Sequence, residues 1–390
     1  MKKVKLKKRG DFRIKSGGLW IFSNEIETSL KDFSPGEVAE IEDDTGSFTG
    51  IGYFNPETLI AGRILSRKKE RIDGDFFLRR LKTAWNLRMK FFGGENSFRW
   101  IFSEGDFLPG LIIDYYNGIA AAQILTAGME NLIPLIAEIV LTKFPVSGLY
   151  LMNDEPFRNY EGLSSYTGYY PESREKPELI EFSENGIKYC FSFSSAQKTG
   201  HFFDQRENRK MVKGLVKNKR VLDLFSYNGS WSLNALASGA KSATAADSSQ
   251  TALEQAVKNA EMNGFSSRLS VRKLNLIQEL PFKKDFYDLV ILDPPALIKN
   301  RKNIKSGTAA YIKLNRNALK IIPVNGWLIS CSCSYHLSQA AFIEVIYKAA
   351  QKAQRGIQLV EMRGQAKDHP VLPAMPETRY LKCALLRVIE

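Results

Sequence analysis

Apolar runs alternate with amphipathic stretches through the last two hundred residues of the chain. This pattern predicts strands at 220–226, 241–247, 268–274, 287–293 and 327–333, and helices at 230–238, 251–263, 309–322 and 338–352. Apolar strands separated by amphipathic helices are typical of a parallel sheet that is covered on both faces. Two last strands, at 357–364 and 380–389, have no good helix between them, so we expect an antiparallel hairpin at one edge of the sheet.

The N-terminal half has a different pattern. Residues 1 to about 70 contain short strands broken by Gly and Asn/Pro turns, which predicts a small β-rich module. The run from Asp75 to Phe92 has apolar residues at helical spacing, and turn-rich β runs, a second helix and a strand follow it. We expect an α+β middle domain there, with the polar stretch 164–178 as the linker. The predicted domains are 1–70, 71–180 and 181–390.

The charge of the chain favours a polyanionic partner. It holds 55 Lys and Arg against 42 Asp and Glu, a formal net charge of +13 with a pI of about 9.4, and such an excess suits contacts with phosphates. A generally basic surface is the simpler alternative. The first fifteen residues carry eight cations against Asp11 alone, and these are Lys2, Lys3, Lys5, Lys7, Lys8, Arg9, Arg13 and Lys15. They suit a nucleic-acid backbone, or they form a solvated basic tail.

Other features narrow the class of protein. No apolar stretch follows the basic start, so we do not expect export, and no window approaches the roughly 18 to 20 apolar residues of a membrane span. The four cysteines form no CxxC pair and the three histidines suggest no metal triad. We therefore expect a cytoplasmic protein that binds neither a metal nor a membrane.

A nucleoside pocket is predicted at the end of the first strand of the C-terminal sheet. Asp223 lies in that strand, the loop Ser226 to Ser230 follows it, and Asp247 closes the next strand, where an acid can hold ribose hydroxyls. The loop has one glycine, Gly229, so it lacks the three-glycine pattern that receives a pyrophosphate. S-adenosylmethionine, which has no phosphate, fits better than a dinucleotide. A generic nucleotide-binding fold is the alternative.

The fourth strand ends in the sequence Asp293-Pro294-Pro295-Ala296-Leu297. The two prolines keep the backbone extended and direct the Asp293 side chain into the cleft beside the cofactor. In many amino-group methyltransferases an aromatic residue follows the prolines, whereas Ala296 and Leu297 stand there in this chain. This difference disfavours methylation of an exocyclic nitrogen.

The fifth strand ends with two cysteines, Cys331 and Cys333, two residues apart. Residues at i and i+2 share a face of a strand, so we expect both thiols to point the same way at the edge that holds the site. A thiolate that adds to C6 of a pyrimidine activates C5 for methylation. The structural alternative is a pair of small buried cysteines.

The polar stretch from Gln197 to Arg209 precedes the first strand of the C-terminal domain, and we expect it to act as a lid over the cofactor. Lys198 and Arg206 could instead be ordinary surface charges.

Together these motifs resemble the bacterial 23S ribosomal RNA cytosine-5 methyltransferase I family. The matching segments are KTGHFFDQRENR, VLDLFSYNGSWS, ADSSQTALEQAVKNAEMNG, DPPAL, SCS and DHPVLPAMPETRYLK, with GGLWIFSNEIE, GYFNPETLIAGRILS, EGDFLPGLIIDYY and FRNYEGL in the N-terminal half. The resemblance implies a PUA-type RNA-binding module, an α+β middle domain and a class I, Rossmann-like S-adenosylmethionine methyltransferase domain. An α/β fold with a seven-stranded sheet is therefore expected.

The resemblance also implies roles for individual residues. Cys333 would be the nucleophile and Asp293 would contact the target base. The predicted cofactor-binding residues are Lys198, Thr199, Gly200, Phe203, Arg206, Asp223, Phe225, Ser226, Tyr227, Asn228, Gly229, Asp247, Ser248, Asn275, Asp293 and Pro294. Three positions depart from the family pattern: Asn275 replaces a common acid, Leu297 an aromatic residue, and Cys331 adds a second thiol.

We therefore expect an enzyme that forms 5-methylcytosine in ribosomal RNA with S-adenosylmethionine as cofactor. Two alternatives remain open at this stage: a methyltransferase that acts on a base nitrogen of ribosomal RNA, and a non-catalytic RNA-binding factor in ribosome assembly. A nicotinamide dehydrogenase is disfavoured by the single-glycine loop. The oligomeric state is open, with a homodimer as one option.

Overall fold

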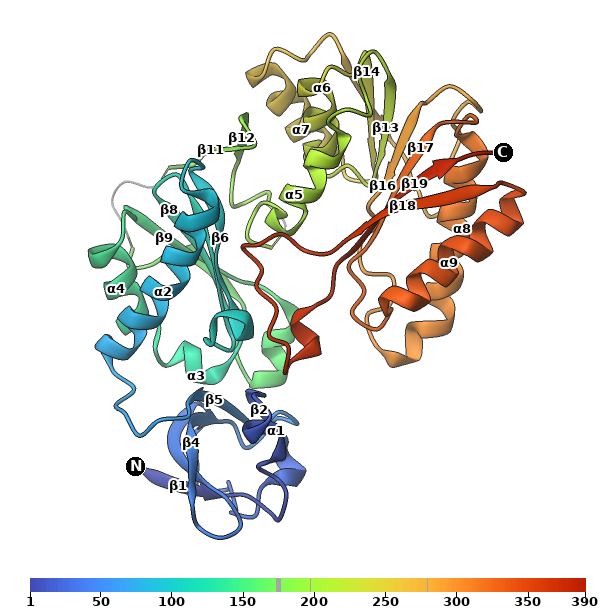
Figure 1. Cartoon of the computed structure of the whole chain (residues 1–390). Coiled ribbons are helices and arrows are strands. Elements are labelled where there is room, and N and C mark those ends of the chain that lie inside the picture. Colours follow the sequence, from blue (N-terminus) through green and yellow to red (C-terminus); the bar gives the residue numbers. More distant parts are fainter. Residues whose placement is uncertain (173–176, 197, 279) are drawn as a thin grey trace. The chain divides into compact units, whose positions relative to one another are not determined.

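The computed structural model describes residues 1–172, 177–196, 198–278 and 280–390. They form two compact units (Figure 1). The first unit contains Met1–Phe182, Ser192–Phe203 and Lys367–Thr378, and the second contains Ser183–Phe191, Asp204–Ala366 and Arg379–Glu390. The chain therefore passes between the units several times, and each unit is described by itself below. The three predicted domains, with boundaries at 70 and 180, stay a prediction.

The first unit begins with a five-stranded sheet in the order β1-β3-β4-β5-β2. Its elements are β1 (Lys2–Lys5), α1 (Phe12–Lys15), β2 (Trp20–Ile21), the 3-10 turn η1 (Ser23–Glu25), β3 (Glu37–Glu42), β4 (Phe48–Phe54) and β5 (Gly62–Ser66). Alternation places Ala39 and Ile41 of β3 in a core with Val4 and Ile64, while Glu40 lies on the opposite, partly exposed face. The predicted β-rich module is thus present.

Most of the N-terminal cations have acidic partners within this module. Lys2 and Lys3 of β1 pair with Glu37 and Glu42 of the neighbouring β3, at 3.0 and 2.5 Å. Lys5, Arg13 and Lys15 pair with Glu27, Glu25 and Asp11 in the same way. The excess of positive charge that is visible in the first fifteen residues is therefore largely balanced in three dimensions, because strand pairing brings glutamates from later in the chain beside the lysines.

A second sheet of the first unit has the order β10-β9-β8-β7-β6. Its elements, with the helices beside it, are α2 (Gly74–Phe92), β6 (Ser97–Phe102), η2 (Ser103–Asp106), β7 (Leu111–Tyr116), β8 (Ile119–Ile124), α3 (Ala127–Glu130), α4 (Ile133–Lys143), β9 (Gly148–Asn153), η3 (Pro156–Glu161) and β10 (Tyr166–Tyr169). The predicted long helix begins one residue early, because the Asp73 side chain caps it by accepting from the Phe76 N–H.

The predicted linker differs in part from the structure. Tyr166–Tyr169 forms β10, which pairs antiparallel with β9 and brings the Tyr169 ring to 5.0 Å from the Tyr150 ring. The polar composition of this stretch predicted a linker, whereas part of it forms the edge strand of the sheet. Residues 173–176 of the same stretch lie outside the described residues.

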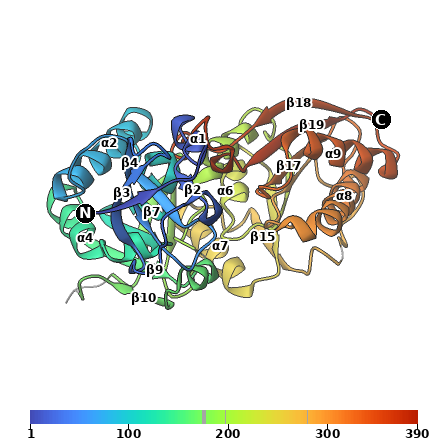
Figure 2. The same ribbon diagram turned by 90° about the horizontal axis from the view of Figure 1, so that it is seen from below.

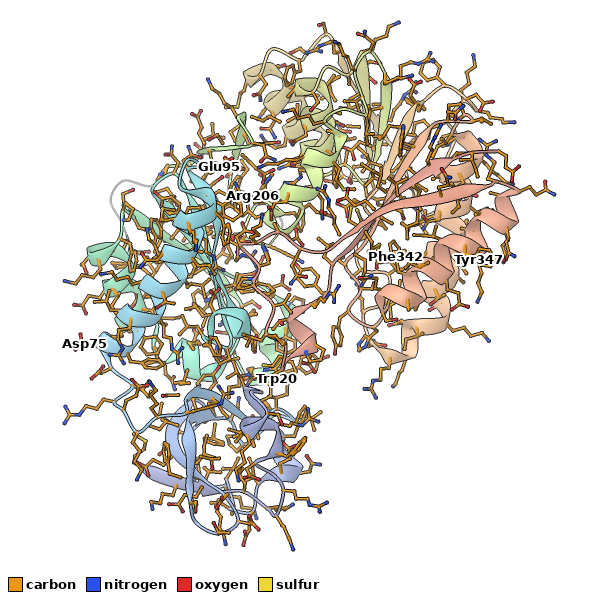
Figure 3. The ribbon with its side chains drawn as sticks, in the orientation of Figure 1. Trp20, Asp75, Glu95, Arg206, Phe342 and Tyr347 are labelled. Carbon is orange, nitrogen blue, oxygen red and sulfur yellow. The ribbon has the colours of Figure 1, made fainter. Side chains whose placement is uncertain are left out.

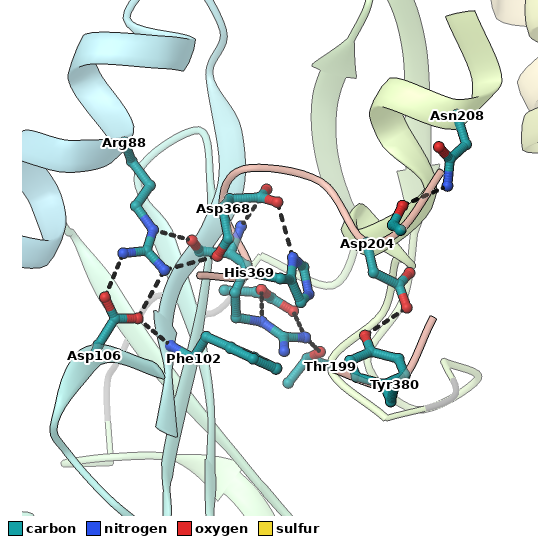
Figure 4. Close-up of polar contacts among 12 residues, drawn as sticks. Arg88, Phe102, Asp106, Thr199, Asp204, Asn208, Asp368, His369 and Tyr380 are labelled. Carbon is teal, nitrogen blue, oxygen red and sulfur yellow. Dashed lines mark hydrogen bonds and ion pairs between the residues drawn. The ribbon is translucent and has the colours of Figure 1, made fainter. Parts of the chain in front are cut away.

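Buried charges in the first unit form closed ion pairs (Figure 4). The guanidinium of Arg88 is fully buried and donates to both carboxylate oxygens of Asp106, at 2.5 and 2.7 Å, and to the carbonyl of Asp368. Arg99 likewise forms a bidentate ion pair with buried Asp114, donating one hydrogen bond to each carboxylate oxygen. The C-terminal segment Lys367–Thr378 is thereby tied into this unit.

The second unit contains the predicted seven-stranded sheet, in the order β15-β14-β13-β16-β17-β19-β18. Its strands are β13 (Arg220–Leu224), β14 (Ser242–Asp247), β15 (Leu269–Lys273), β16 (Leu289–Leu292), β17 (Trp327–Ser332), β18 (Ile357–Arg363) and β19 (Lys382–Val388). The first five are parallel, and β19 pairs antiparallel with β17 and with β18. The expected C-terminal hairpin is confirmed, with β19 inserted between β17 and β18.

Helices cover both faces of this sheet, as expected (Figures 1 and 2). One face carries α6 (Ser230–Ala237) and α7 (Gln250–Met262), and the other carries α8 (Ile304–Ile321) and α9 (Gln339–Ala353). On α9, Phe342 is fully buried against the sheet while Tyr347 is 58% exposed (Figure 3). Smaller elements complete the chain: β11 (Ile180–Glu184), β12 (Ile187–Phe191), η4 (Phe203–Gln205), α5 (Arg206–Arg209), η5 (Lys210–Val212), η6 (Arg301–Asn303) and η7 (Pro376–Thr378).

Helix α8 begins five residues before its predicted start, because its N-terminal turns are polar and carry no apolar periodicity. Among the described residues, no helix combines the length and the apolar character that a membrane span requires.

Candidate active site

Three predicted site residues, all aspartates, lie at the carboxyl edge of the parallel strands of the second unit. Strands β13, β14 and β16 end beside one another, with Leu224 next to Ala246 and Leu292. Asp223, Asp247 and Asp293 therefore lie at one edge of the sheet, where folds of this type bind ligands. The sequence pattern predicted this placement because parallel strands share an orientation.

Asp223 is fully buried and only one of its carboxylate oxygens has a described partner. Ser232 donates to Oδ2 through its backbone N–H at 3.0 Å and its hydroxyl at 2.8 Å, whereas Oδ1 has no hydrogen-bond partner among the described residues. Burial raises the pKa of Asp223 from 3.8 to about 7, and the charges of Asp293 and Asp247 add to the effect. An unpartnered buried carboxylate oxygen is costly unless a cationic group binds it.

The loop after β13 has a tight, unusual backbone. Phe225, Tyr227 and Gly229 all have positive φ angles, at 62°, 48° and 78°. A side chain at Gly229 would also meet the Cβ of Ala256 at 2.9 Å, so only glycine fits where α6 starts against α7. The buried hydroxyl of Ser226 has no hydrogen-bond partner among the described residues. The loop therefore holds a buried hydroxyl without a described partner at the edge of the sheet where folds of this type bind ligands.

Asp247 ties the loop to the second strand. Its two oxygens accept from the backbone N–H groups of Tyr227 and Ser249, at 3.0 and 2.9 Å, while the side chain keeps a partly exposed edge. The neighbouring Ser248 is exposed, and exposed Asn275 lies two residues past β15 at the same edge. Asn228 is buried; its side-chain oxygen accepts from the Ser230 hydroxyl.

Asp293 is held by two donors that the sequence did not reveal. Gln205 donates to Oδ1 and the indole N–H of Trp231 donates to Oδ2, both at 3.0 Å. Burial raises the pKa of Asp293 to about 6. Since Gln205 comes from the polar stretch before β13 and Trp231 from the first turn of α6, only the folded chain brings these donors to the DPP segment.

The two cysteines differ in burial, and the expectation that both thiols point the same way stays a prediction. Cys331 is fully buried in β17, in a cluster with Ile329 and Cys383, and burial raises the pKa of its thiol well above the usual value. Cys333 follows the last residue of β17, is partly exposed, and has its Sγ 3.9 Å from the carbonyl oxygen of Pro294. Cys333 is the thiol beside the DPP segment.

Lys382, at the start of β19, was not singled out from the sequence. Its ammonium donates to the carbonyls of Ser334 and Tyr380, at 2.6 and 2.7 Å. Burial lowers the pKa of Lys382 to about 8, and the charge of the Cys333 thiolate opposes that shift. The antiparallel register that sets Ser332 opposite Lys382 brings this cation to the thiol. A lysine 49 residues after the cysteine gives no sequence signal of such a contact.

The segment after Cys333 is fixed by a buried hydroxyl. Ser334 Oγ accepts from the backbone N–H of Ile298 at 3.0 Å and lies 3.0 Å from the hydroxyl of Tyr311 on α8. The loop that follows the DPP segment is thereby attached to the segment that holds the thiol. Burial raises the pKa of Tyr311, and the charge of Cys333 raises it further.

The predicted lid is divided between the two units. Lys198, Thr199, Gly200 and Phe203 belong to the first unit, where Phe203 packs 5.2 Å from the ring of Tyr116. Lys198 is exposed, with its ammonium 5.6 Å from the Phe202 ring. Gln197 lies outside the described residues. The role of this segment as a lid stays a prediction.

Arg206 belongs to the second unit and is fully buried, at the start of α5, so it is not a surface charge. Its backbone carbonyl accepts from the side chain of Asn185. Beside it, Asp204 accepts from the hydroxyl of Tyr380 at 2.6 Å (Figure 4).

The edge of the sheet fits S-adenosylmethionine. The free oxygen of Asp223 suits the ammonium of the amino-acid end, the Ser226 hydroxyl adds a polar contact, and the partly exposed Asp247 suits ribose hydroxyls. Pro294, which follows Asp293, is buried, and its carbonyl oxygen lies 3.9 Å from the Cys333 sulfur. Within the described residues, no group of three or more His, Cys, Asp or Glu side chains could hold a metal ion.

Comparisons with known proteins agree with this geometry. Residues 4–67 match a PUA-like domain family, and residues 167–387 match the S-adenosylmethionine-dependent methyltransferase family. The chain is 34% identical to the ribosomal RNA large subunit methyltransferase I of Alteromonas mediterranea over 378 residues, with 95% of each chain covered. It is 36% identical to the proteins of the same name from Aliivibrio fischeri and Aeromonas salmonicida, with 95% and 94% of each chain covered.

Solved structures share the whole fold. A protein described as a methyltransferase, crystallised with SAH, superposes with a TM-score of 0.85 at 21% identity, and each chain is covered completely. A protein from Streptococcus mutans described as S-adenosylmethionine-dependent gives a TM-score of 0.83, also at 21% identity. At this identity the likeness shows the fold alone.

Proposed function

We propose that this chain, which belongs to the ribosomal RNA large subunit methyltransferase I family of S-adenosylmethionine-dependent methyltransferases, forms 5-methylcytosine in 23S ribosomal RNA. In this proposal the thiolate of Cys333 is the nucleophile. The observation that carries this proposal is the position of Cys333. Its sulfur lies beside Pro294, directly after Asp293, at the edge that suits the cofactor, and the ammonium of Lys382 lies near it. With such a substrate, the cytoplasm is the location that we propose.

The need for a thiol follows from the chemistry of the base. C5 of cytosine is a weak nucleophile until a thiolate adds to C6 and delivers electron density to C5. Bound S-adenosylmethionine supplies an electrophilic methyl carbon on a sulfonium. In the proposed reaction Cys333 forms the S–C6 bond, and C5 takes the methyl group as the bond of that group to the sulfonium sulfur breaks and leaves a neutral thioether. The C5 proton then leaves to solvent water, and the S–C6 bond breaks to return the thiolate.

The surrounding residues prepare this step. A cation near a thiol favours the thiolate, and the Lys382 ammonium is held in place by two carbonyls. Asp293, oriented by Gln205 and Trp231, is placed to hydrogen-bond the Watson–Crick edge of a flipped cytosine. Its pKa of about 6 leaves the carboxylate largely ionised at neutral pH, as an acceptor for the exocyclic amine.

Replacement of the nucleophile is the direct test. We expect Cys333→Ala to abolish methyl transfer to ribosomal RNA, by a factor on the order of 10⁴ or more, because a nucleophile that makes a covalent adduct has no substitute. Nucleoside mass spectrometry of the reacted RNA gives both the yield and the methylated atom. Cys331→Ala is the matched control, since that thiol is buried in the core, and it should retain methylation.

Three outcomes would overturn the proposal. Methyl transfer by Cys333→Ala at the wild-type rate would exclude the thiolate mechanism. A product methylated on a base nitrogen would identify the alternative enzyme class. If wild-type protein binds RNA but shows no affinity for S-adenosylmethionine in calorimetry, the chain is a binding factor instead.

A further inference from the structure

Four exposed cations follow the DPP segment without acidic partners. Lys299 lies in the loop before η6, Arg301 and Lys302 lie in η6, and Lys305 lies in the first turn of α8; all four side chains are exposed. Within the described part of the chain none of the four forms an ion pair. These four residues are called the α8 basic segment below. This segment contrasts with the N-terminal module, where five of the eight cations are paired with Glu or Asp.

The α8 basic segment is attached to the segment that holds the thiol. Ile298, the residue before Lys299, donates its backbone N–H to Ser334 Oγ at 3.0 Å, and Ser334 directly follows Cys333. Tyr311, further along α8, reaches the same hydroxyl. The α8 basic segment and the reactive sulfur thus adjoin two segments that hydrogen bonds to Ser334 hold together in the second unit.

Helix stability does not account for these charges. Backbone dipoles make the N-terminal end of a helix partially positive, so cations there are unfavourable and acidic residues are preferred. The first turn of α8 contains no acidic residue, and Arg301, Lys302 and Lys305 stand at this end instead. Since the placement costs some stability of the free protein, an anionic partner is the simplest physical reason for it.

We propose that the α8 basic segment binds the phosphate backbone of the substrate RNA beside the target nucleotide. This inference rests on the proposed function, because it takes RNA as the substrate. Lys and Arg side chains without internal partners release counterions from a polyanion when they bind it, whereas paired lysines must first give up their carboxylates. The binding is therefore independent of sequence and positions the strand, while the pocket at Asp293 and Cys333 selects the base.

The test compares two quadruple variants. In the first, Lys299, Arg301, Lys302 and Lys305 are all replaced by Gln. In the matched control, four exposed lysines that precede strands at the opposite, amino edge of the same sheet are replaced by Gln: Lys213, Lys217, Lys241 and Lys352. Both variants change the net charge by the same amount. Calorimetry with S-adenosylmethionine shows whether each variant is folded at the cofactor site.

The readout is the affinity for a ribosomal RNA fragment as a function of salt. Each lost phosphate contact on a single strand lowers the slope of log K against log salt by about 0.7, so the first variant should lose about 2 to 3 units of slope and roughly 10-fold or more in affinity near 0.1 M salt. An RNA of unrelated sequence should lose affinity by the same factor. The control should keep the wild-type slope within about one unit.

The outcomes separate the two proposals. If the first variant keeps the wild-type slope, or if the control loses as much, this inference is wrong even though wild-type enzyme still produces 5-methylcytosine. If wild-type protein binds RNA with the predicted difference between variants but yields no 5-methylcytosine, the proposed function fails and the surface stands. If wild-type protein binds no RNA, both proposals are overturned.

Discussion

The buried ion pairs of the first unit differ from the buried carboxylate at the carboxyl edge of the second unit's sheet, although the second unit also holds a buried pair, Arg209 with Glu184. In the first unit Arg88 and Asp106 satisfy each other with two short hydrogen bonds, and Arg99 and Asp114 do the same. In the second unit the fully buried Asp223 keeps one oxygen without a described partner. A closed ion pair holds a fold together, whereas an unsatisfied buried carboxylate weakens the free protein and is explained by a ligand. The difference distinguishes structural charges from functional ones.

The largest effect should come from breaking the buried ion pair between Arg88 and Asp106. Arg88→Leu leaves Asp106 buried without its cation, so we expect a loss of about 3 to 5 kcal/mol in the free energy of unfolding. Chemical denaturation of the two proteins measures this loss. The double variant Arg88→Leu/Asp106→Leu removes both charges and should recover much of the stability. A loss below about 1 kcal/mol in the single variant would mean that this pair is not structural.

A smaller effect, on binding rather than stability, is expected at Asp223. Asp223→Asn removes the charge that would hold the cofactor ammonium, so affinity for S-adenosylmethionine should fall by about 10- to 100-fold, as a lost charge-assisted hydrogen bond predicts. Calorimetry measures the affinity. Ser232→Ala is the companion variant: it removes the hydroxyl donor from Oδ2 and leaves Oδ1 untouched, so it should bind the cofactor more tightly than Asp223→Asn.

The pH dependence of the same variant sharpens this contrast. The pKa of Asp223 is raised to about 7, so the free folded protein keeps a proton that the unfolded chain releases near pH 4. Stability from this group is thus present at low pH and is lost as pH rises from about 4 to 7. Cofactor affinity should do the opposite and increase up to about pH 7. Asp223→Asn should show neither trend, and a wild-type affinity that is constant between pH 5 and 8 would contradict this assignment.

The smallest expected effect concerns Lys382. Lys382→Met should raise the midpoint pH of Cys333 alkylation by iodoacetamide by about one unit, because a nearby cation favours the thiolate. The other three cysteines are buried, so Cys333 dominates the reaction, and Cys333→Ser gives the background. Lys382→Arg should restore the wild-type midpoint. Above about pH 8 the amine itself loses its proton, so the wild-type and Met profiles should converge; identical profiles at all pH values would remove Lys382 from this role.

Local patterns predicted much of the second unit correctly. The period of the apolar residues predicted the strands of the sheet and the helices beside it, and their parallel arrangement placed Asp223, Asp247 and Asp293 at one edge. The start of α8 and the strand β10 were missed because both are rich in polar or aromatic residues without a clear period. These errors are local, since neither changes the order of the strands.

Relations between distant segments could not be predicted in this way. The sequence left open whether the N-terminal lysines bind a nucleic-acid backbone or form a solvated tail. Strand pairing sets Lys2 and Lys3 beside Glu37 and Glu42. The contact of Gln205 with Asp293, and the closeness of Lys382 to Cys333, each depend on the register of segments that are far apart in the chain. Each of these contacts is made by a single side chain, so no periodic pattern in the sequence indicates it.

The amino-acid sequence by itself determined the succession of elements, the covered sheet and the edge at which the carboxylates meet, because apolar periodicity and strand direction are local properties. Only the tertiary structure decided which charges are neutralised, which of the two thiols is accessible, and which buried oxygen remains for a ligand. The physical reason is that desolvation and pairing depend on every neighbour in space, and those neighbours come from segments that the chain brings together only when it folds.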